Sequence, residues 1–266
     1  MTSEAGSSEA GLDVRTAGGV LELHIAASSR QNAIDAATAE RMTGLLRESN
    51  LDRGVRAVLI TGEGRYFCTG AQVAPGATDM SILDYRWATR HFSDLTRALW
   101  ELEKPVVSAV NGTVAGAGWM LALLADLVVA AEGARWTHVF SRRGMVPHAG
   151  DTFYLPRILP FHRLMEIAFL SDSWTSEQLH EIGAVNRVVA ANEVLPSARE
   201  LAVRLAEGPT RSLGFAKRLY RNSLNVDLDT ALREERDATA LLSQTHDRVE
   251  GMKAWIEGRP PQFIGD

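Results

Sequence analysis

Residues 104–118 read Lys104-Pro-Val-Val-Ser-Ala-Val-Asn-Gly-Thr-Val-Ala-Gly-Ala-Gly118, and this stretch gives the clearest indication of the fold. Its apolar run Val106–Val110 is typical of a buried strand, and the glycine-rich turn that follows opens a predicted helix over residues 119–125. Residues 106–125 carry no charge and have the length of a transmembrane helix. The glycines and polar side chains among them indicate instead a strand, a turn and a helix in a buried core. No membrane partner is expected.

Strands and helices alternate on both sides of this stretch. Short apolar or alternating runs predict strands over residues 20–25, 55–60, 127–131 and 185–189. Amphipathic patterns predict helices over residues 35–50 and 81–102, and the capping-box spacing of Thr175 and Gln178 starts another. From Glu193 onward the pattern is almost entirely helical. The sequence therefore predicts an α/β fold with a flexible tail over residues 1–11, a core over residues 12–200 and a helical C-terminal region over residues 201–266.

Composition excludes several classes of protein. The 266 residues are 45% hydrophobic and 23% charged, which argues against wholesale disorder. With 28 basic and 33 acidic side chains the net charge is −5, and no nucleic-acid partner is expected. The single cysteine, Cys68, excludes an internal disulfide framework and a cysteine-based zinc site, and no metal is expected. The chain begins with polar and acidic residues, unlike a secretory signal, so the sequence favours a cytoplasmic protein.

Two glycine-containing turns follow predicted strands and carry the first chemical signal. They cover residues 66–72 and 111–118, and glycine at such places lets the main chain approach a ligand closely. Two turns of this kind can direct two backbone N–H groups at one oxygen atom, which is the arrangement of an oxyanion hole. Glycine-rich turns are also common in ordinary loops that have no chemical role. The spacing alone therefore does not distinguish an oxyanion hole from ordinary loops. No nucleotide-binding or nucleophile-elbow motif offers a competing interpretation.

Several stretches together resemble the crotonase (enoyl-CoA hydratase/isomerase) superfamily, over about residues 12–264. Besides residues 104–118 they are residues 31–34, 60–62, 67–71, 183–185 and 250–259. The resemblance implies a spiral of ββα units with a helical C-terminal region for trimerisation, assembled as a homotrimer or a dimer of trimers. It also implies an acyl-CoA substrate, with coenzyme A as part of the substrate and no separate cofactor. An enolate-like oxyanion would be held by two backbone N–H groups, which by position are those of Ala71 and Ala117.

The sequence departs from the family pattern where hydratases carry two catalytic glutamates. By position these glutamates would stand where this chain has Met120 and Phe140. Neither side chain can hold or transfer a proton, and adding water across a double bond needs a positioned acid and base. We therefore expect no hydration by the two-glutamate route, and we expect Met120 and Phe140 to line an apolar acyl pocket. Trp87 is either a core or subunit contact or a cap on this pocket.

His148 occupies the place where some isomerases of the family carry an acidic base, in the turn Gly144-Met-Val-Pro147-His148. An imidazole can take up a proton at neutral pH, and Asp151, three residues on, could orient it if the segment is helical. The alternative is an exposed turn histidine and an aspartate that caps a helix. His138 is a weaker candidate, because such a histidine is more often simply packed. Cys68 is more typical of a small buried residue than of a nucleophile.

Lys253 and Arg259 lie in the predicted last helix, where family members help to hold coenzyme A, sometimes across a subunit boundary. The resemblance thus predicts an acyl-CoA enzyme that works through an enolate, either a double-bond isomerase or a hydrolase that cleaves a carbon–carbon bond. Two alternatives stay open: a non-catalytic acyl-CoA binding protein, and a scaffold whose function is its own assembly. The two glycine turns argue against the scaffold, which has no use for an oxyanion hole.

Overall fold

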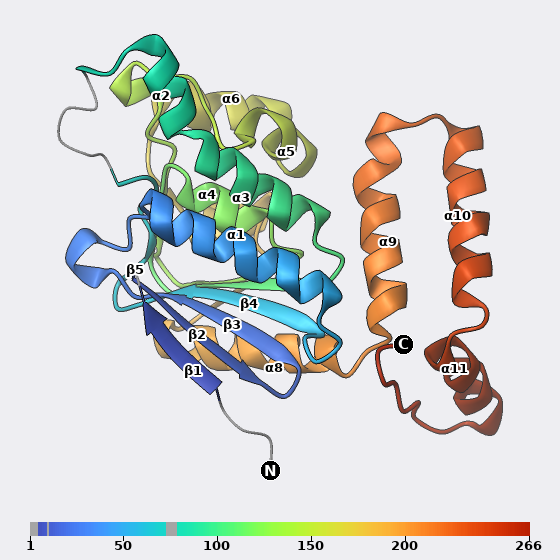
Figure 1. Ribbon diagram of the computed structural model, residues 1–266. Helices are drawn as coiled ribbons and strands as arrows, with labels where there is room; N and C mark the ends of the chain where they lie inside the picture. Colours follow the sequence, from blue (N-terminus) through green and yellow to red (C-terminus); the bar gives the residue numbers. More distant parts are fainter. Residues whose placement is uncertain (1–4, 10, 73–78) are drawn as a thin grey trace.

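A computed structural model describes residues 5–9, 11–72 and 79–266 (Figure 1). Its larger sheet has seven strands, which in spatial order are β1 (Ala5–Glu9), β2 (Leu12–Ala17), β3 (Val20–Ile25), β4 (Ala57–Gly62), β6 (Val106–Val110), β8 (Leu127–Ala131) and β11 (Arg187–Val189). The pairs β1–β2 and β2–β3 are antiparallel, and every later pair across the sheet is parallel. Parallel pairs need crossover connections, and the helices supply them.

A smaller sheet has four strands, in the order β10 (Trp174–Thr175), β9 (Arg135–Thr137), β7 (Thr113–Ala115) and β5 (Tyr66–Cys68). Along the chain β5, β7 and β9 each follow directly after a strand of the larger sheet, β4, β6 and β8, and each precedes a helical segment. The chain therefore winds through repeated units of two strands and a helical connection, with one strand of each unit in each sheet. This arrangement confirms the predicted α/β fold built from ββα units.

Helices cover both faces of the larger sheet (Figure 1). One face lies under α1 (Ala36–Leu51), α3 (Arg90–Glu101) and α4 (Gly118–Leu123), and the other is covered by α8 (Val194–Ala206). The side chains of β4 alternate accordingly, with Val58 and Ile60 in the first core and Ala57 and Leu59 in the second. Because the central parallel strands are buried on both faces, their sequences read as nearly continuous apolar runs.

The remaining core helices are α5 (Asp151–Ile158), α6 (Phe161–Leu170) and α7 (Ser176–Glu181), and Thr175 and Gln178 form the predicted capping box of α7. The helix predicted over residues 81–102 is instead two helices, α2 (Ile82–Ala88) and α3, which meet at Thr89. The Thr89 hydroxyl donates to the carbonyl oxygens of Tyr85 and Arg86, at 3.2 and 3.3 Å, at the end of α2. No residue of α2 is buried, whereas α3 buries Phe92, Leu95, Ala98 and Leu99. The chain therefore turns where the buried face begins.

The flexible tail predicted over residues 1–11 is wrong for residues 5–9, which form β1. This strand pairs antiparallel with β2, from Ala5 opposite Thr16 to Glu9 opposite Leu12. Strand pairing uses main-chain N–H and C=O groups, which a polar sequence supplies as well as an apolar one. The side-chain pattern therefore gave no signal for this strand. Residues 1–4 and 10 lie outside the described residues.

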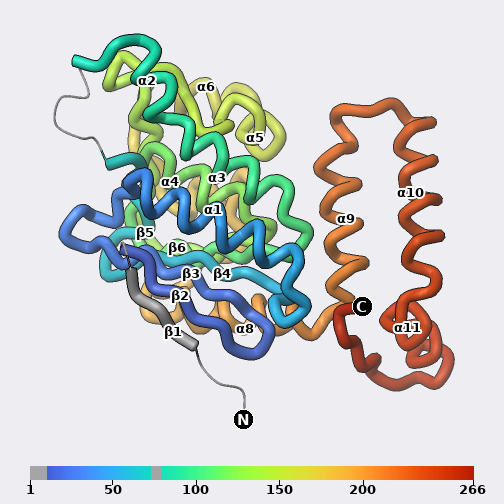
Figure 2. Tube along the Cα trace, viewed as in Figure 1, coloured from blue at the N-terminus to red at the C-terminus, as the bar shows by residue number. Residues whose placement is uncertain are grey.

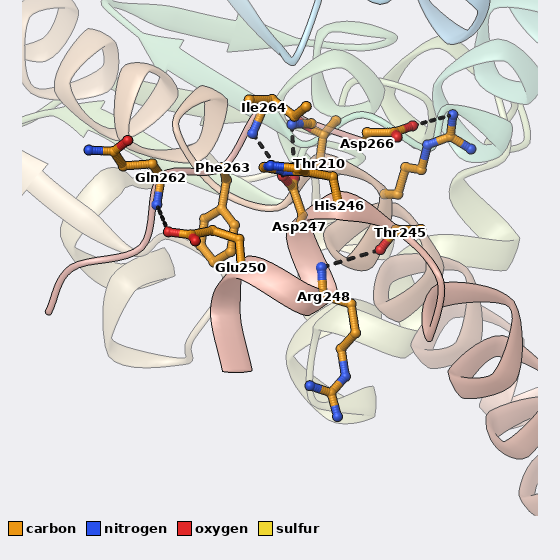
Figure 3. Close-up of polar contacts among 12 residues, drawn as sticks. Thr210, Thr245, His246, Asp247, Arg248, Glu250, Gln262, Phe263, Ile264 and Asp266 are labelled. Carbon is orange, nitrogen blue, oxygen red and sulfur yellow. Dashed lines mark hydrogen bonds and ion pairs between the residues drawn. The ribbon is translucent and has the colours of Figure 1, made fainter. Parts of the chain in front are cut away.

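The C-terminal region is an arm of three helices beside the core, α9 (Thr210–Asn222), α10 (Leu228–Leu242) and α11 (His246–Glu257) (Figure 2). The predicted boundary at residue 200 falls inside α8, which belongs to the core because Leu201, Ala202 and Ala206 are buried against the larger sheet. The last residues fold back along α11, where the buried Asp247 carboxylate accepts hydrogen bonds from the backbone N–H groups of Ile264 (2.7 Å) and Gly265 (2.8 Å) (Figure 3).

Two cations of α9 anchor the arm to the core at Asp126. Lys217 Nζ lies 2.7 Å from the Asp126 carboxylate, and Arg221 Nη2 lies 3.0 Å from it. The Arg221 guanidinium also donates, at 2.7 to 3.0 Å, to the main-chain carbonyl oxygens of Leu99, Trp100 and Leu124. These carbonyls lie at the C-terminal ends of α3 and α4, where the helix itself offers no donor. One side chain thus ties three helices together.

Replacing Arg221 with methionine is expected to lower the free energy of unfolding by about 2–4 kcal/mol, because Asp126 and the helix-end carbonyls lose a common donor. Arg218 of the same helix is the matched control: its side chain is 55% exposed and lies 3.4 Å from Glu103. Arg218→Met should cost less than about 1 kcal/mol. Urea unfolding followed by circular dichroism measures both changes, and equal losses would contradict the anchoring role of Arg221.

Candidate active site

The first glycine turn is held in place by a bridge to Ile34. The backbone N–H of Ile34 donates to Gly70 O, and that of Gln72 donates to Ile34 O, both at 2.8 Å. Ile34 therefore pairs with the residues on either side of Ala71, as in a parallel bridge. The N–H group of Ala71 consequently points away from Ile34.

The two glycine turns touch each other. A Cβ atom at Gly70 would lie 2.9 Å from Ala117 N, and one at Gly118 would lie 2.2 Å from Cys68 O. Both distances are too short for a side chain, so glycine alone permits this approach. Within the part of the chain that the structure describes, the N–H groups of Ala71 and Ala117 donate no hydrogen bond. The junction of the turns therefore has two backbone donors that lack an acceptor among the described residues.

Met120 and Phe140, the residues at the two expected glutamate positions, are buried and apolar. Met120 lies in α4, three residues after Ala117, and is 0% exposed. Phe140 follows β9 and is 3% exposed, and the centroid of its ring lies 4.9 Å from that of His148. Both side chains are buried and apolar, so neither can carry a proton.

His148 lies half-buried between two phenylalanine rings, Phe140 at 4.9 Å and Phe92 at 6.0 Å between centroids. The residues after it, Ala149 and Gly150, both adopt left-handed backbone conformations, with φ of 56° and 80°. Burial lowers the pKa of His148 below its ordinary value of 6.5, while the negative charge of Asp151 acts in the opposite direction. The imidazole is therefore neutral at pH 7 and can accept a proton.

Asp151 was predicted from the sequence to orient His148. In the structure it pairs with His138 instead and does not bond to the His148 side chain. Its carboxylate lies 3.0 Å from His138 Nε2 and accepts a hydrogen bond from the Tyr154 hydroxyl. The alternative of an N-cap is also wrong, because Gly150 is the N-cap of α5 and Asp151 is its first residue. Tyr154 is not among the residues predicted from the sequence. Its spacing of three residues from Asp151 in a helix is the signal that could have indicated it.

The other expected ligand-binding residues do not join this site within one chain. Trp87 is 64% exposed on α2, with the Arg90 guanidinium over its ring, so it does not pack with Met120 and Phe140. Lys253 is exposed on α11, in the arm, which lies on the side of the core away from α2 (Figure 2). The Arg259 guanidinium is held by Glu250 and Glu257, at 2.6 to 2.8 Å, and is not a free cation for a phosphate.

Cys68 is not a nucleophile in this structure. It is fully buried, and burial raises the pKa of its thiol to about 12, so the reactive thiolate does not form near neutral pH. Among the residues that the structure describes, no cluster of three or more His, Cys, Asp or Glu side chains is arranged to hold a metal ion. Over the same residues, no helix has both the length and the apolar character needed to span a bilayer.

Comparison with known proteins shows the family to which this chain belongs. The family model for Enoyl-CoA hydratase/isomerase matches residues 15–266. The chain belongs to the enoyl-CoA hydratase/isomerase family. The 1,2-epoxyphenylacetyl-CoA isomerase of Escherichia coli K12 is 35% identical to it, over 93% of this chain and 95% of that protein. The carnitinyl-CoA dehydratase of Proteus mirabilis is 31% identical, over 96% of this chain and 98% of that protein.

Solved structures of the enoyl-CoA hydratase/isomerase family share the same fold. An enoyl-CoA hydratase from Bacillus anthracis superposes with a TM-score of 0.90 at 28% identity, over 97% of this chain and 100% of that one. The predicted resemblance and the crotonase fold are thereby confirmed, and the protein is an acyl-CoA enzyme of this family. Its relatives are named for isomerisation, hydration and dehydration. The reaction of this member must therefore be argued from its own residues.

Proposed function

We propose that the protein is an acyl-CoA isomerase in which the backbone N–H groups of Ala71 and Ala117 hold an enolate oxyanion. The observation that carries this proposal is the contact between the two glycine turns, which brings together two backbone donors that have no acceptor in the part of the chain described. Donors aimed at a carbonyl oxygen stabilise the negative charge that develops when the adjacent carbon loses a proton, and each is typically worth about 10²–10³-fold in rate. The bound thioester supplies that carbonyl oxygen, and coenzyme A enters only as part of the substrate.

In this proposal His148 carries the proton. The neutral imidazole takes a proton from the carbon next to the thioester carbonyl, and the electron pair moves onto the carbonyl oxygen as the enolate. In a thioester whose double bond lies between the β and γ carbons, the enolate is conjugated with that double bond. The imidazolium gives its proton to the γ carbon, the electron pair returns from the oxygen, and the double bond ends between the α and β carbons. No atom is gained or lost, so the step needs neither water nor a second reactant.

Two observations favour isomerisation over hydration and hydrolysis. Met120 and Phe140 offer no acid or base for adding water. Asp151 is 1% exposed and is bonded to His138 and Tyr154, which leaves it unavailable to activate a water molecule. The isomerase name of the Escherichia coli relative agrees with this choice. A non-catalytic acyl-CoA binder would bind the same ligands and exchange no proton, which a measurement of exchange decides.

The rate of proton exchange is expected to stay level at neutral pH and to fall only at a pH below 6.5, the ordinary pKa of histidine. Burial lowers the pKa of His148 from 6.5, and only the neutral imidazole can take up a proton. The active form is therefore fully present above the lowered pKa and is lost as the pH falls through it. A pH profile of kcat/KM for exchange measures this dependence, and a rate that increases toward acid pH would contradict His148 as the base.

We also propose that the protein assembles as a homotrimer or a dimer of trimers through the arm. The two outer helices expose large apolar side chains, namely Leu232, Leu241, Val249, Met252, Trp255 and Ile256, and such a surface is typical of a protein contact. Analytical ultracentrifugation should give three or six times the chain mass of 29.0 kDa, and Trp255→Glu should shift the protein toward monomer. A monomeric wild-type protein at micromolar concentration would refute the assembly. In a trimer, Lys253 would come within reach of a coenzyme A bound to another subunit.

A further inference from the structure

Three buried side chains behind His148 form a connected set that the proposed proton transfer does not use. His138, Asp151 and Tyr154 are 0%, 1% and 1% exposed. Asp151 lies at the centre, with one carboxylate oxygen 3.0 Å from His138 Nε2 and the other accepting a hydrogen bond from the Tyr154 hydroxyl. His138 comes from the segment after β9, whereas Asp151 and Tyr154 lie one turn apart on α5.

In this set the Tyr154 hydroxyl is the donor in its contact with the Asp151 carboxylate. Burial and the neighbouring Asp151 raise the pKa of Tyr154 well above its ordinary value of 10, so the phenol keeps its proton and donates it to the carboxylate. A carboxylate can only accept, and His138 therefore carries a proton on Nε2 and donates that hydrogen bond as well. Both donors come from fully buried side chains, so the carboxylate is held in one place.

Stability alone does not explain why these residues are polar. Replacing a buried charged group and its partners with apolar side chains of the same shape is often neutral or stabilising. In addition, His138 Nδ1 is buried and has no hydrogen-bond partner among the described residues, which is a further cost. The buried polar set of His138, Asp151 and Tyr154 lowers stability and lies close to His148. This combination indicates that the set serves the chemistry of His148.

The charge of Asp151 acts on the His148 imidazole, while its carboxylate bonds to His138 and Tyr154 and not to the His148 ring. The backbone N–H of Asp151 donates to His148 O at 3.3 Å, and the ring of Phe140 packs against both His138 (4.8 Å) and His148 (4.9 Å). The other titratable groups that act on His148 are His91 of α3 and His138, and an imidazole cannot supply a negative charge. Asp151 is therefore the negative group that can balance the imidazolium formed when His148 takes up a proton.

We propose that His138 and Tyr154 are positioning residues that hold the Asp151 carboxylate as a fixed counter-charge behind His148. The catalytic meaning of this arrangement rests on the proposed role of His148. The counter-charge stabilises the imidazolium of the enolate intermediate, and it makes His148 a stronger base than its burial alone would allow.

A titration of His148 tests the counter-charge without any need for turnover. Carbon-13 NMR of the intact protein follows the seven histidines, and His148→Ala identifies the signal of His148. In Asp151→Asn we expect the midpoint of His148 to move to lower pH by roughly one unit. The matched control is Asp247→Asn, which removes another buried carboxylate in the C-terminal arm and should leave that midpoint in place. An unchanged midpoint in Asp151→Asn would overturn the proposal, even if the wild-type protein showed no exchange at all.

Kinetics then test the two positioning residues. His138→Leu and Tyr154→Phe each remove one donor from the carboxylate, and we expect kcat for exchange to fall roughly tenfold with little change in KM. His138→Gln can still donate an N–H to Asp151 and should recover most of that loss. A purely structural network would lower the melting temperature in all three variants without changing kcat or the acid limb of its pH profile, and that outcome would overturn the proposal. Loss of exchange in the wild type itself would refute the proposed function instead.

Discussion

Replacing His148 with alanine is expected to slow the exchange of the α-proton of a bound acyl-CoA with solvent by about 10²–10⁴-fold. The imidazole lies half-buried between the rings of Phe92 and Phe140, and burial keeps it neutral at pH 7. A methyl group in its place cannot take up a proton, whereas the apolar wall around it remains. We therefore expect the rate to fall while the Kd for acyl-CoA changes little. Mass spectrometry of deuterium uptake measures the rate, and calorimetry measures the Kd.

His162 is the control for this substitution, because it is an exposed histidine on α6. His162→Ala should leave both the exchange rate and the Kd unchanged. If His148→Ala exchanged protons as fast as the wild type, His148 would not be the base, and the proton would have to leave by another route.

Replacing Ala117 with proline is expected to slow exchange by about 10²–10³-fold, the usual loss when one oxyanion donor is removed. The backbone of Ala117 has φ of −62°, which is close to the value that the proline ring imposes. The substitution therefore removes the N–H group with little strain at Ala117. No hydrogen bond is lost, because this N–H group has no acceptor within the described residues.

Ala117→Gly is the matched control for the loss of the donor. It deletes the methyl group but keeps the N–H, and its exchange rate should stay within a few-fold of the wild type. Thermal unfolding of both variants checks that the contact with Gly70 and the fold survive. Equal rates in the proline and glycine variants would show that Ala117 is not an oxyanion donor.

The strands of this fold that are buried on both faces could be predicted closely from the sequence. The strands predicted over residues 106–110 and 127–131 match β6 and β8 to the residue, because a doubly covered parallel strand is an uninterrupted apolar run. The motif over residues 31–34 also has a structural explanation. The Asn32 amide donates to the carbonyl oxygens of Glu63 and Tyr66, at 2.9 and 2.7 Å, and so fixes the approach to the first glycine turn.

Only those features of the candidate site that depend on residues close together in the sequence could be predicted. The positions of Met120 and His148 follow from short motifs, but the partner of Asp151 does not, because His138 is thirteen residues away in another element. A helical spacing relates Asp151 to Tyr154 and says nothing of tertiary contacts. Trp87 was predicted to be either a core or subunit contact or a cap on the pocket, and it was expected on one long helix over residues 81–102. The break at Thr89 leaves this side chain exposed on α2.

One measurement tests the central claim, that the two glycine turns and His148 make an enolate of a bound acyl-CoA. The wild-type protein is incubated in heavy water with a panel of acyl- and enoyl-CoAs, binding is confirmed by calorimetry, and the recovered thioesters are weighed by mass spectrometry. We predict that at least one ligand gains deuterium at the carbon next to the carbonyl, at a rate far above that without protein. Tight binding across the panel with no deuterium uptake would contradict the claim and identify the protein as an acyl-CoA binder.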